Sequence, residues 1–278
     1  MTAPLSLTRH GAAEGLPLVL LHAFPLDSRM WEGVIGELPE IPVITLDAPG
    51  FGASRSPRAV ADAVGRPLAP SLKTYADAVA ATLTGAGVDR AVVAGLSMGG
   101  YVALALAERR RALLAGVGLL DTKATADDAD ARANRVRVAE QAAGSLGSRA
   151  VAPMVDAVLS PTTHRQRPEV VATVSRWLAE APPAGIAWAQ RAMAGRPDRR
   201  SALDGLGVPA LVLRGADDAS SSDQDVETMA QALADVEVVV VPDAGHLSAV
   251  EDPGAVAAAL RALHERAVRH EKAQRQPG

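Results

Sequence analysis

The segment Val92–Arg110 reads VVAGLSMGGYVALALAERR, and it predicts a strand, a tight turn and a helix in direct succession. Gly95 and Gly99 bracket Ser97 in the pattern G-x-S-x-G. Glycines at these places let the strand and the helix approach closely, which would leave the serine hydroxyl exposed at the carboxyl end of the strand. The segment makes Ser97 a candidate nucleophile. The alternative is a structural serine in a glycine-rich turn.

The rest of the chain repeats this alternation of apolar, β-branched runs with longer alanine-rich stretches. Such a pattern predicts an α/β fold with a mostly parallel, doubly wound sheet, because strands buried on both faces are apolar throughout. The predicted strands are 16–24, 41–49, 90–96, 113–121, 208–215 and 236–242. The predicted helices of this part are 71–86, 97–110, 222–234 and 253–269.

The strand pattern stops between Asp121 and Val208 and gives way to amphipathic helical patterns separated by glycine and proline. We therefore expect a core domain made of residues 1–121 and 208–270, interrupted by a helical insertion at 122–207. The final residues, 271–278, are polar and are predicted to be a disordered tail.

Composition excludes several functional classes. The chain has 278 residues, a net charge of −4 and no evident basic face, so no nucleic-acid partner is expected. It has no cysteine, which excludes disulfides and thiolate catalysis. No apolar run is long enough to span a membrane, and no targeting segment is evident, so a soluble cytoplasmic protein is predicted. The oligomeric state cannot be read from the sequence.

Two further segments carry candidate catalytic groups after predicted strands. His246 lies in PDAGHLSAVEDP, where its pKa suits proton transfer near neutral pH. Asp217 and Asp218 lie in LRGADDASS, and either carboxylate could orient the histidine. Each residue alone could be an ordinary loop residue. The order serine, acid, histidine, each placed after a strand, favours a catalytic triad.

The chain resembles the α/β-hydrolase superfamily through the motifs HAFPLD, DAPGFGAS, GLSMGG, GADD and AGH. It is similar to capped members such as small carboxylesterases, enol-lactonases and cofactor-free perhydrolases. The resemblance implies a sheet of the α/β-hydrolase type with a helical cap inserted after the sixth strand. It implies neither a cofactor nor a metal.

The resemblance also implies roles for particular residues. Ser97, Asp218 and His246 would form the triad, because the family pattern G-x-x-D counted from Gly215 ends at Asp218. Asp217 would then be a turn residue, and Asp121 ranks third as the acid because some members place it before the cap. The family often has a proline soon after the acid, where this chain has ASSSD.

The oxyanion hole would be formed by the backbone N–H groups of Phe24 and Met98. His22 would hold the shape of the first loop rather than act as the base, and Ala23 stands where the family usually has glycine. The segment DAPGFGAS, with Asp47, Gly50 and Gly52, would shape a turn near the site.

The predicted function is a serine hydrolase that cleaves a small carboxylic ester or lactone through an acyl-enzyme, with a small-molecule acyl substrate as its partner. A C–C hydrolase, a thioesterase and a perhydrolase remain alternatives within the same chemistry. A slow or non-enzymatic ligand receptor is the alternative from another class. The residues Trp177, Trp188, Met154 and Met193 could line an acyl pocket or pack within the cap.

Overall fold

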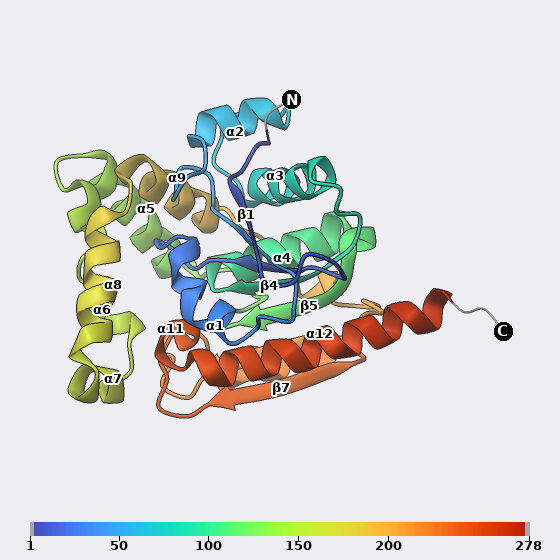
Figure 1. Cartoon of the computed structure of the whole chain (residues 1–278). Coiled ribbons are helices and arrows are strands. Elements are labelled where there is room, and N and C mark those ends of the chain that lie inside the picture. Colours follow the sequence, from blue (N-terminus) through green and yellow to red (C-terminus); the bar gives the residue numbers. More distant parts are fainter. Residues whose placement is uncertain (1–2, 276–278) are drawn as a thin grey trace.

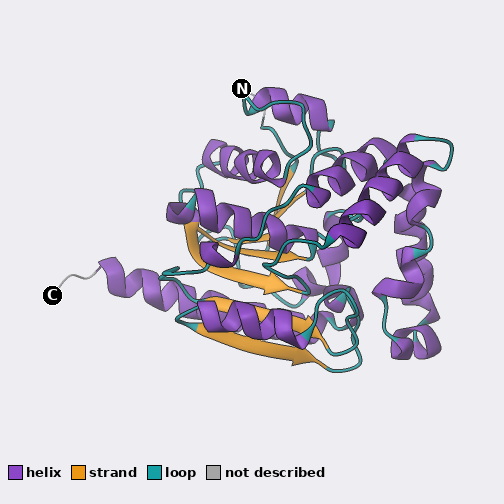
Figure 2. Cartoon of the chain, turned by 180° about the vertical axis from the view of Figure 1, so that it is seen from behind, coloured by secondary structure: helices purple, strands orange, loops and turns teal. Residues whose placement is uncertain are grey.

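A mostly parallel sheet forms the centre of the molecule in the computed structural model, which describes residues 3–275 (Figures 1 and 2). Within these residues the sheet has seven strands in the order β1-β3-β2-β4-β5-β6-β7. All neighbours are parallel except β1 and β3. The strands are β1 Leu7–His10, β2 Leu18–Leu21, β3 Val43–Leu46, β4 Ala91–Leu96, β5 Leu114–Leu120, β6 Ala210–Gly215 and β7 Val236–Val241.

The predicted fold class is confirmed, and each of the six predicted strands contains one of the strands β2–β7. Every residue of β2, β3, β4 and β5 is buried, which explains their continuous apolar runs. Strand β1 was not predicted; its residues LTRH lie at the sheet edge, where the two outer ones are half-buried and the two middle ones exposed. Its pairing with β3, from Leu7 opposite Leu46 to His10 opposite Val43, could not be seen in so short and polar a segment.

Helices cover both faces of this sheet (Figures 1 and 2). On one face α3 packs against α4, and on the other α1 packs against α12. The helices outside the insertion are α1 Glu32–Gly36, α2 Pro57–Ala63, α3 Leu72–Gly85, α4 Met98–Arg109, α10 Asp223–Ala232, α11 Ser248–Glu251 and α12 Pro253–Arg275.

Between β5 and β6 the chain forms helices only, and they gather at one end of the molecule, on the left in Figure 1. The resemblance placed this insertion after the sixth strand. In the described structure one strand, β1, precedes the strand predicted at 16–24, so the strand before the insertion is β5, the fifth along the chain. The predicted count of six strands before the insertion is therefore wrong. Its helices are α5 Ala129–Ala143, α6 Met154–Val158, α7 Pro161–Gln166, α8 Pro168–Glu180 and α9 Pro183–Ala194.

The carboxyl-terminal segment differs from the predicted tail. Helix α12 continues to Arg275, so a disordered tail at 271–278 is wrong for residues 271–275. Glu271 forms an ion pair with Arg90, with 2.6 Å between Nη2 and Oε1, which ties the end of the helix to the start of β4. Residues 276–278 lie outside the described residues. No helix that the structure describes is long and apolar enough to cross a membrane.

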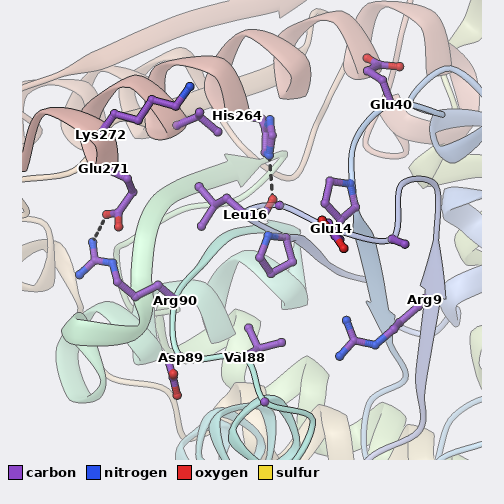
Figure 3. A pocket seen from close by; sticks show the side chains of 16 residues that line it. Arg9, Glu14, Leu16, Glu40, Val88, Asp89, Arg90, His264, Glu271 and Lys272 are labelled. Carbon is purple, nitrogen blue, oxygen red and sulfur yellow. Dashed lines mark hydrogen bonds and ion pairs between the residues drawn. The ribbon is translucent and has the colours of Figure 1, made fainter. Parts of the chain in front are cut away.

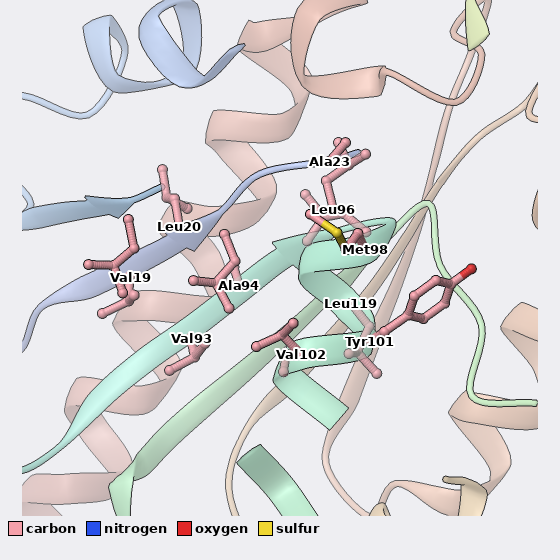
Figure 4. Packing of buried hydrophobic residues seen from close by; sticks show 14 of the residues in the cluster. Val19, Leu20, Ala23, Val93, Ala94, Leu96, Met98, Tyr101, Val102 and Leu119 are labelled. Atoms are coloured by element: carbon pink, nitrogen blue, oxygen red, sulfur yellow. The ribbon is translucent and has the colours of Figure 1, made fainter. Parts of the chain in front are cut away.

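The backbones approach each other very closely at the turn between β4 and α4. Ser97 has φ 54° and ψ −110°, a backbone conformation that residues other than glycine rarely adopt. A Cβ atom on Gly99 would lie 2.1 Å from the carbonyl oxygen of Leu21, and one on Gly95 would lie 2.1 Å from the carbonyl carbon of Gly99. Figure 4 shows the apolar side chains of β2, β4 and α4 packed around this turn. The helix therefore rests directly on the backbone of β2.

We predict that Gly99→Ala destabilises the protein severely, because a methyl group there meets backbone atoms that have no side-chain freedom with which to move away. The expected cost is at least about 3 kcal/mol, or loss of soluble protein. Gly85→Ala is the matched control, since it also changes a helical glycine and its Cβ would meet nothing within 4 Å. That variant should be unchanged or more stable by up to about 1 kcal/mol. Equal midpoints of thermal unfolding in the two variants would refute this account of the turn.

Candidate active site

Three of the predicted site residues lie at the carboxyl ends of parallel strands and meet there. Ser97 directly follows β4, Asp218 follows β6 and His246 follows β7. The Nε2 atom of His246 lies 2.8 Å from Oγ of Ser97. Its Nδ1 atom lies 2.9 Å from Oδ1 of Asp218. The structure thus brings the three together in the order serine, histidine, acid.

The direction of these hydrogen bonds follows from the chemistry of the groups. An ionised carboxylate only accepts, so Nδ1–H of His246 donates to Asp218. In the neutral ring Nε2 is then left unprotonated and accepts the hydroxyl hydrogen of Ser97. A histidine held in this tautomer is ready to take the serine proton.

Electrostatics favour an ionised acid beside a basic histidine. Burial alone would raise the pKa of Asp218. The charge and hydrogen bond of His246, together with the hydrogen bonds from Ser221 and Ser220, outweigh burial and lower this pKa. Burial alone would lower the pKa of His246, but the Asp218 carboxylate outweighs it and raises the pKa. A negative Asp218 beside His246 therefore favours the protonated imidazolium, which the predicted triad would require.

Serines hold Asp218 in place, in the segment where the family often has proline. The Ser220 N–H donates to Oδ1 of Asp218 at 2.7 Å, and the Ser221 hydroxyl donates to Oδ2. Arg214 donates to the carbonyl oxygen of Asp218 at 2.9 Å. Asp217 is exposed and its N–H donates to Ala244, so it has the position of a turn residue.

Asp121, the third-ranked acid, lies close behind this group without bonding to the histidine. Its side chain accepts the N–H of Gly215 at 2.7 Å and pairs with the hydroxyl of Ser248. Burial, together with the negative charge of Asp218, raises the pKa of Asp121 to about 7. Two neighbouring carboxyl groups are thus driven to opposite states, with Asp218 ionised and Asp121 holding its proton below neutral pH.

The two predicted oxyanion donors flank Ser97. Phe24 lies in the loop after β2, and Met98 is the first residue of α4. In the described part of the chain, neither backbone N–H donates to a protein acceptor. The predicted role as oxyanion donors requires N–H groups without a protein acceptor, and these two meet that requirement.

His22 has the structural surroundings that the sequence predicted for it. The backbone N–H of Ala48 donates to its Nε2 at 2.9 Å, so Nδ1 carries the hydrogen and donates to the carbonyl of Ala23 at 2.9 Å. Burial lowers the pKa of His22, which keeps the ring neutral. Both ring nitrogens are occupied, and the ring links the loop after β2 to the loop after β3.

Asp47 shapes the neighbouring turn. Its carboxylate accepts the N–H groups of Ser28 and Ala53, both at 2.9 Å. Gly52 has φ 50°, and a Cβ there would lie 2.2 Å from Oδ2 of Asp47, so only glycine fits against the carboxylate.

A cavity of about 260 Å³ opens beside Ser97 and His246. Its wall combines Phe24 and Tyr101 from the core with residues of the helical insertion, including both predicted methionines, Met154 and Met193. The tryptophans do not line it. Trp188 is buried, and Trp177 lies under the guanidinium of Arg29 at 5.9 Å from the ring centre.

Another hollow, of about 680 Å³, lies near the amino ends of the central strands (Figure 3). It is lined by Pro17 and Arg90, which precede β2 and β4, and by His264 of α12. Since the triad lies at the carboxyl ends of the strands, this hollow is separate from it.

Three charged residues at the site were not predicted from the sequence. Lys123 and Arg135 line the cavity. Glu251 is buried, and its carboxylate accepts the N–H of Gly245 and the N–H of Ser160, both at 2.8 Å. It therefore ties the histidine loop to the insertion. The only sequence signal for Glu251 was an acidic residue in the apolar stretch before the last helix.

No group of three or more histidine, aspartate or glutamate side chains within residues 3–275 is arranged to hold a metal ion.

Comparison with known proteins places the chain in a family. The model of the alpha/beta hydrolase family matches residues 18–259. The chain belongs to the α/β hydrolase family. The predicted superfamily is thus confirmed, and so is the prediction that the protein is an enzyme of the hydrolase class.

Individual relatives cover almost the whole chain. It is 32% identical to a 2-succinyl-6-hydroxy-2,4-cyclohexadiene-1-carboxylate synthase of Enterobacter sp. (strain 638), over 88% of this chain and 91% of the relative. Among solved structures it is similar to a thermophilic esterase from Thermogutta terrifontis, with a TM-score of 0.86, 38% identity and coverage of 95% and 93% of the two chains. It is also similar to the enol-lactonase from Burkholderia xenovorans LB400, with a TM-score of 0.82, 25% identity and coverage of 93% and 95%.

We predict that Asp121→Asn unfolds at nearly the same temperature as wild type at acidic pH and at a higher temperature than wild type at alkaline pH. The asparagine keeps the acceptor for Gly215 N–H and offers a donor to Ser248, so it imitates the protonated acid. The folded-state pKa of Asp121 is raised from 3.8 to about 7, so the stability that its proton contributes is fully present below 3.8 and is lost as the pH rises through 7. The variant loses nothing over this range.

Thermal unfolding at about pH 4 and about pH 8 tests this prediction. The two proteins should have similar midpoints at the lower pH, and the variant should unfold higher by on the order of 5 °C at the upper pH. Groups that titrate in both proteins cancel in the comparison. A difference in midpoint that is the same at both pH values would contradict the raised pKa.

Proposed function

We propose that the protein is a serine hydrolase of small carboxylic esters or lactones, acting through an acyl-enzyme with Ser97 as nucleophile. The observation that carries the proposal is the pair of hydrogen bonds from Asp218 through His246 to Ser97, beside a cavity open to a ligand. The similarity to an esterase and an enol-lactonase supports ester and lactone substrates.

In this mechanism Oγ of Ser97 bonds to the carbonyl carbon while its proton passes to Nε2 of His246. The electron pair of the carbonyl moves onto its oxygen, which the N–H groups of Phe24 and Met98 stabilise, each by roughly 3 kcal/mol. The imidazolium, stabilised by Asp218, then protonates the leaving alcohol as the C–O bond breaks. A water molecule repeats the sequence on the acyl-serine and releases the acid.

We also propose that residues 122–207 act as a cap over this site. Helices α5, α6 and α9 each contribute residues to the cavity that contains Ser97. Glu251 supports this role, because it bonds to both the histidine loop and the insertion. A cavity of about 260 Å³ favours a small substrate.

We predict that Ser97→Ala folds normally and loses hydrolysis of short-chain aryl esters, by about 10⁴-fold or more in kcat, because no other hydroxyl lies against Nε2 of His246 in the described structure. The informative measurement is a panel of acyl lengths, lactones and thioesters, with wild type compared to this variant as the blank. The unfolding midpoint of the variant serves as the control for folding. Ordinary turnover by Ser97→Ala would end the assignment of the nucleophile.

A second prediction separates the two acids. Asp218→Asn should lower kcat by about 10³–10⁴-fold, because Asp218 fixes the tautomer of His246 and stabilises its charged form. Asp121→Asn should stay within about tenfold of wild type, since Asp121 makes no hydrogen bond to the histidine. Kinetics with one aryl ester at about pH 8 decide between them. Collapse in the second variant and near-normal turnover in the first would make Asp121 the acid.

A further inference from the structure

The cavity beside Ser97 has a cationic wall. Arg135, on the inner side of α5, and Lys123, after β5, line it together with Ser97 and His246. Among the lining residues that the structure describes, none is a carboxylate. A ligand in this cavity therefore meets two positive side chains and no negative one.

The carboxylate nearest to these cations lies behind the wall and is already neutralised. Asp127 forms ion pairs with Arg196 at 2.7 Å, with Arg135 at 2.6 Å and with Lys123 at 3.7 Å. Its side chain and that of Arg196 are each only 2% exposed, and Arg196 stacks over the ring of Tyr101 at 4.0 Å. Asp127 balances only one of these three cations, so the cluster of Asp127, Arg196, Arg135 and Lys123 keeps a net charge of two positive charges.

Arg135 keeps part of its guanidinium available on the cavity side. Its Nε donates to Asp127, and its Nη1 donates weakly to Gln190 at 3.3 Å. Its Nη2 donates to no acceptor within the described part of the chain. Only a fifth of its side chain is exposed, so solvent satisfies this cation less well than it would satisfy one on an open surface.

We propose that Arg135 and Lys123 form a carboxylate-binding subsite, and that the substrate of this hydrolase carries a carboxylate besides the ester or lactone group that Ser97 attacks. This inference rests on the proposed function, because the subsite and the nucleophile share one cavity. The Nη2 group of Arg135 has no acceptor among the described residues and can donate to a carboxylate oxygen, and Lys123 adds a second, flexible donor. A bound carboxylate would partly neutralise the surplus positive charge that Asp127 leaves.

The position of the subsite relative to the chemistry supports the same conclusion. The charge of Arg135 lowers the pKa of His246, although the larger effect of Asp218 raises this pKa overall. A carboxylate held by Arg135 thus lies near enough to the reacting groups to belong to one small molecule. The size of the cavity, about 260 Å³, is also that of one small molecule.

The test compares two esters that differ only in this charge: the mono-4-nitrophenyl ester of adipic acid, and the same compound with its free carboxylate capped as a methyl ester. Wild type should favour the anionic ester by at least tenfold in kcat/KM at low ionic strength. Added salt should reduce the preference, because it screens a partly exposed ion pair. Arg135→Met should lose at least tenfold of this ratio, whereas Arg135→Lys should keep much of it.

Arg132→Met is the matched control, since Arg132 lies on the same helix, is exposed and does not line the cavity. It removes the same charge from the protein and should leave both rates close to those of wild type. An equal loss of preference in Arg132→Met and Arg135→Met would reduce the effect to net charge and overturn the subsite. Unfolding midpoints of all variants exclude a merely misfolded cap.

The outcomes separate this inference from the proposed function. If wild type hydrolyses neither ester nor the rest of the substrate panel, the proposed function fails. If it hydrolyses the neutral ester as well as the anionic one, the hydrolase stands and the carboxylate subsite is wrong. Calorimetry on Ser97→Ala gives a readout without turnover. Glutarate should bind, its uncharged diamide should not, and Arg135→Met in the same background should abolish the binding. Binding of inorganic phosphate without glutarate would overturn the carboxylate assignment.

Discussion

The close contact of α4 with the backbone of β2 is the constraint on which the rest of the site depends. It is possible only because Gly95 and Gly99 have no side chains where the backbones approach. The contact forces Ser97 to φ 54°, which costs on the order of 1–3 kcal/mol and is sustained by the buried core around it. In return Ser97 projects beyond the sheet edge, where the loops after β6 and β7 also end. The acid and the histidine need only short loops to reach it.

Around this fixed serine, burial and charge give the two neighbouring acids different states. The carboxylate of Asp218 accepts three hydrogen bonds, one of them from His246, so it stays ionised in spite of burial. Asp121 is buried beside that negative charge, and these two effects outweigh the opposing charge of His246, so the pKa of Asp121 rises to about 7. One negative charge close to His246 raises its pKa, and a second ionised carboxyl would repel the first. Below about pH 7, Asp121 is thus the uncharged member of the pair and Asp218 carries the negative charge beside His246.

The sequence predicted those features that depend on local pattern. Strands buried on both faces are apolar throughout, and motifs that follow them in a fixed order indicated Ser97, Asp218 and His246, which the structure places in hydrogen-bond contact. It did not predict β1, because LTRH is short and polar and is recognisable only through its pairing with β3. Nor could the sequence predict that Glu251 and Arg135 lie at the site. Each makes contacts with residues more than fifty positions away along the chain, and no local pattern records such convergence.

The core and the insertion contribute to the site in different ways. In the core, the turn that holds Ser97 depends on backbone contacts that leave no room for a side chain at Gly95 or Gly99. The insertion meets the site through side chains such as Arg135, which line the cavity. The positive charge of the cavity wall therefore comes from Arg135 and Lys123, which both lie outside the strands of the sheet. This separation explains why the family motifs identify the chemistry of the nucleophile, whereas the substrate must be inferred from the cavity wall.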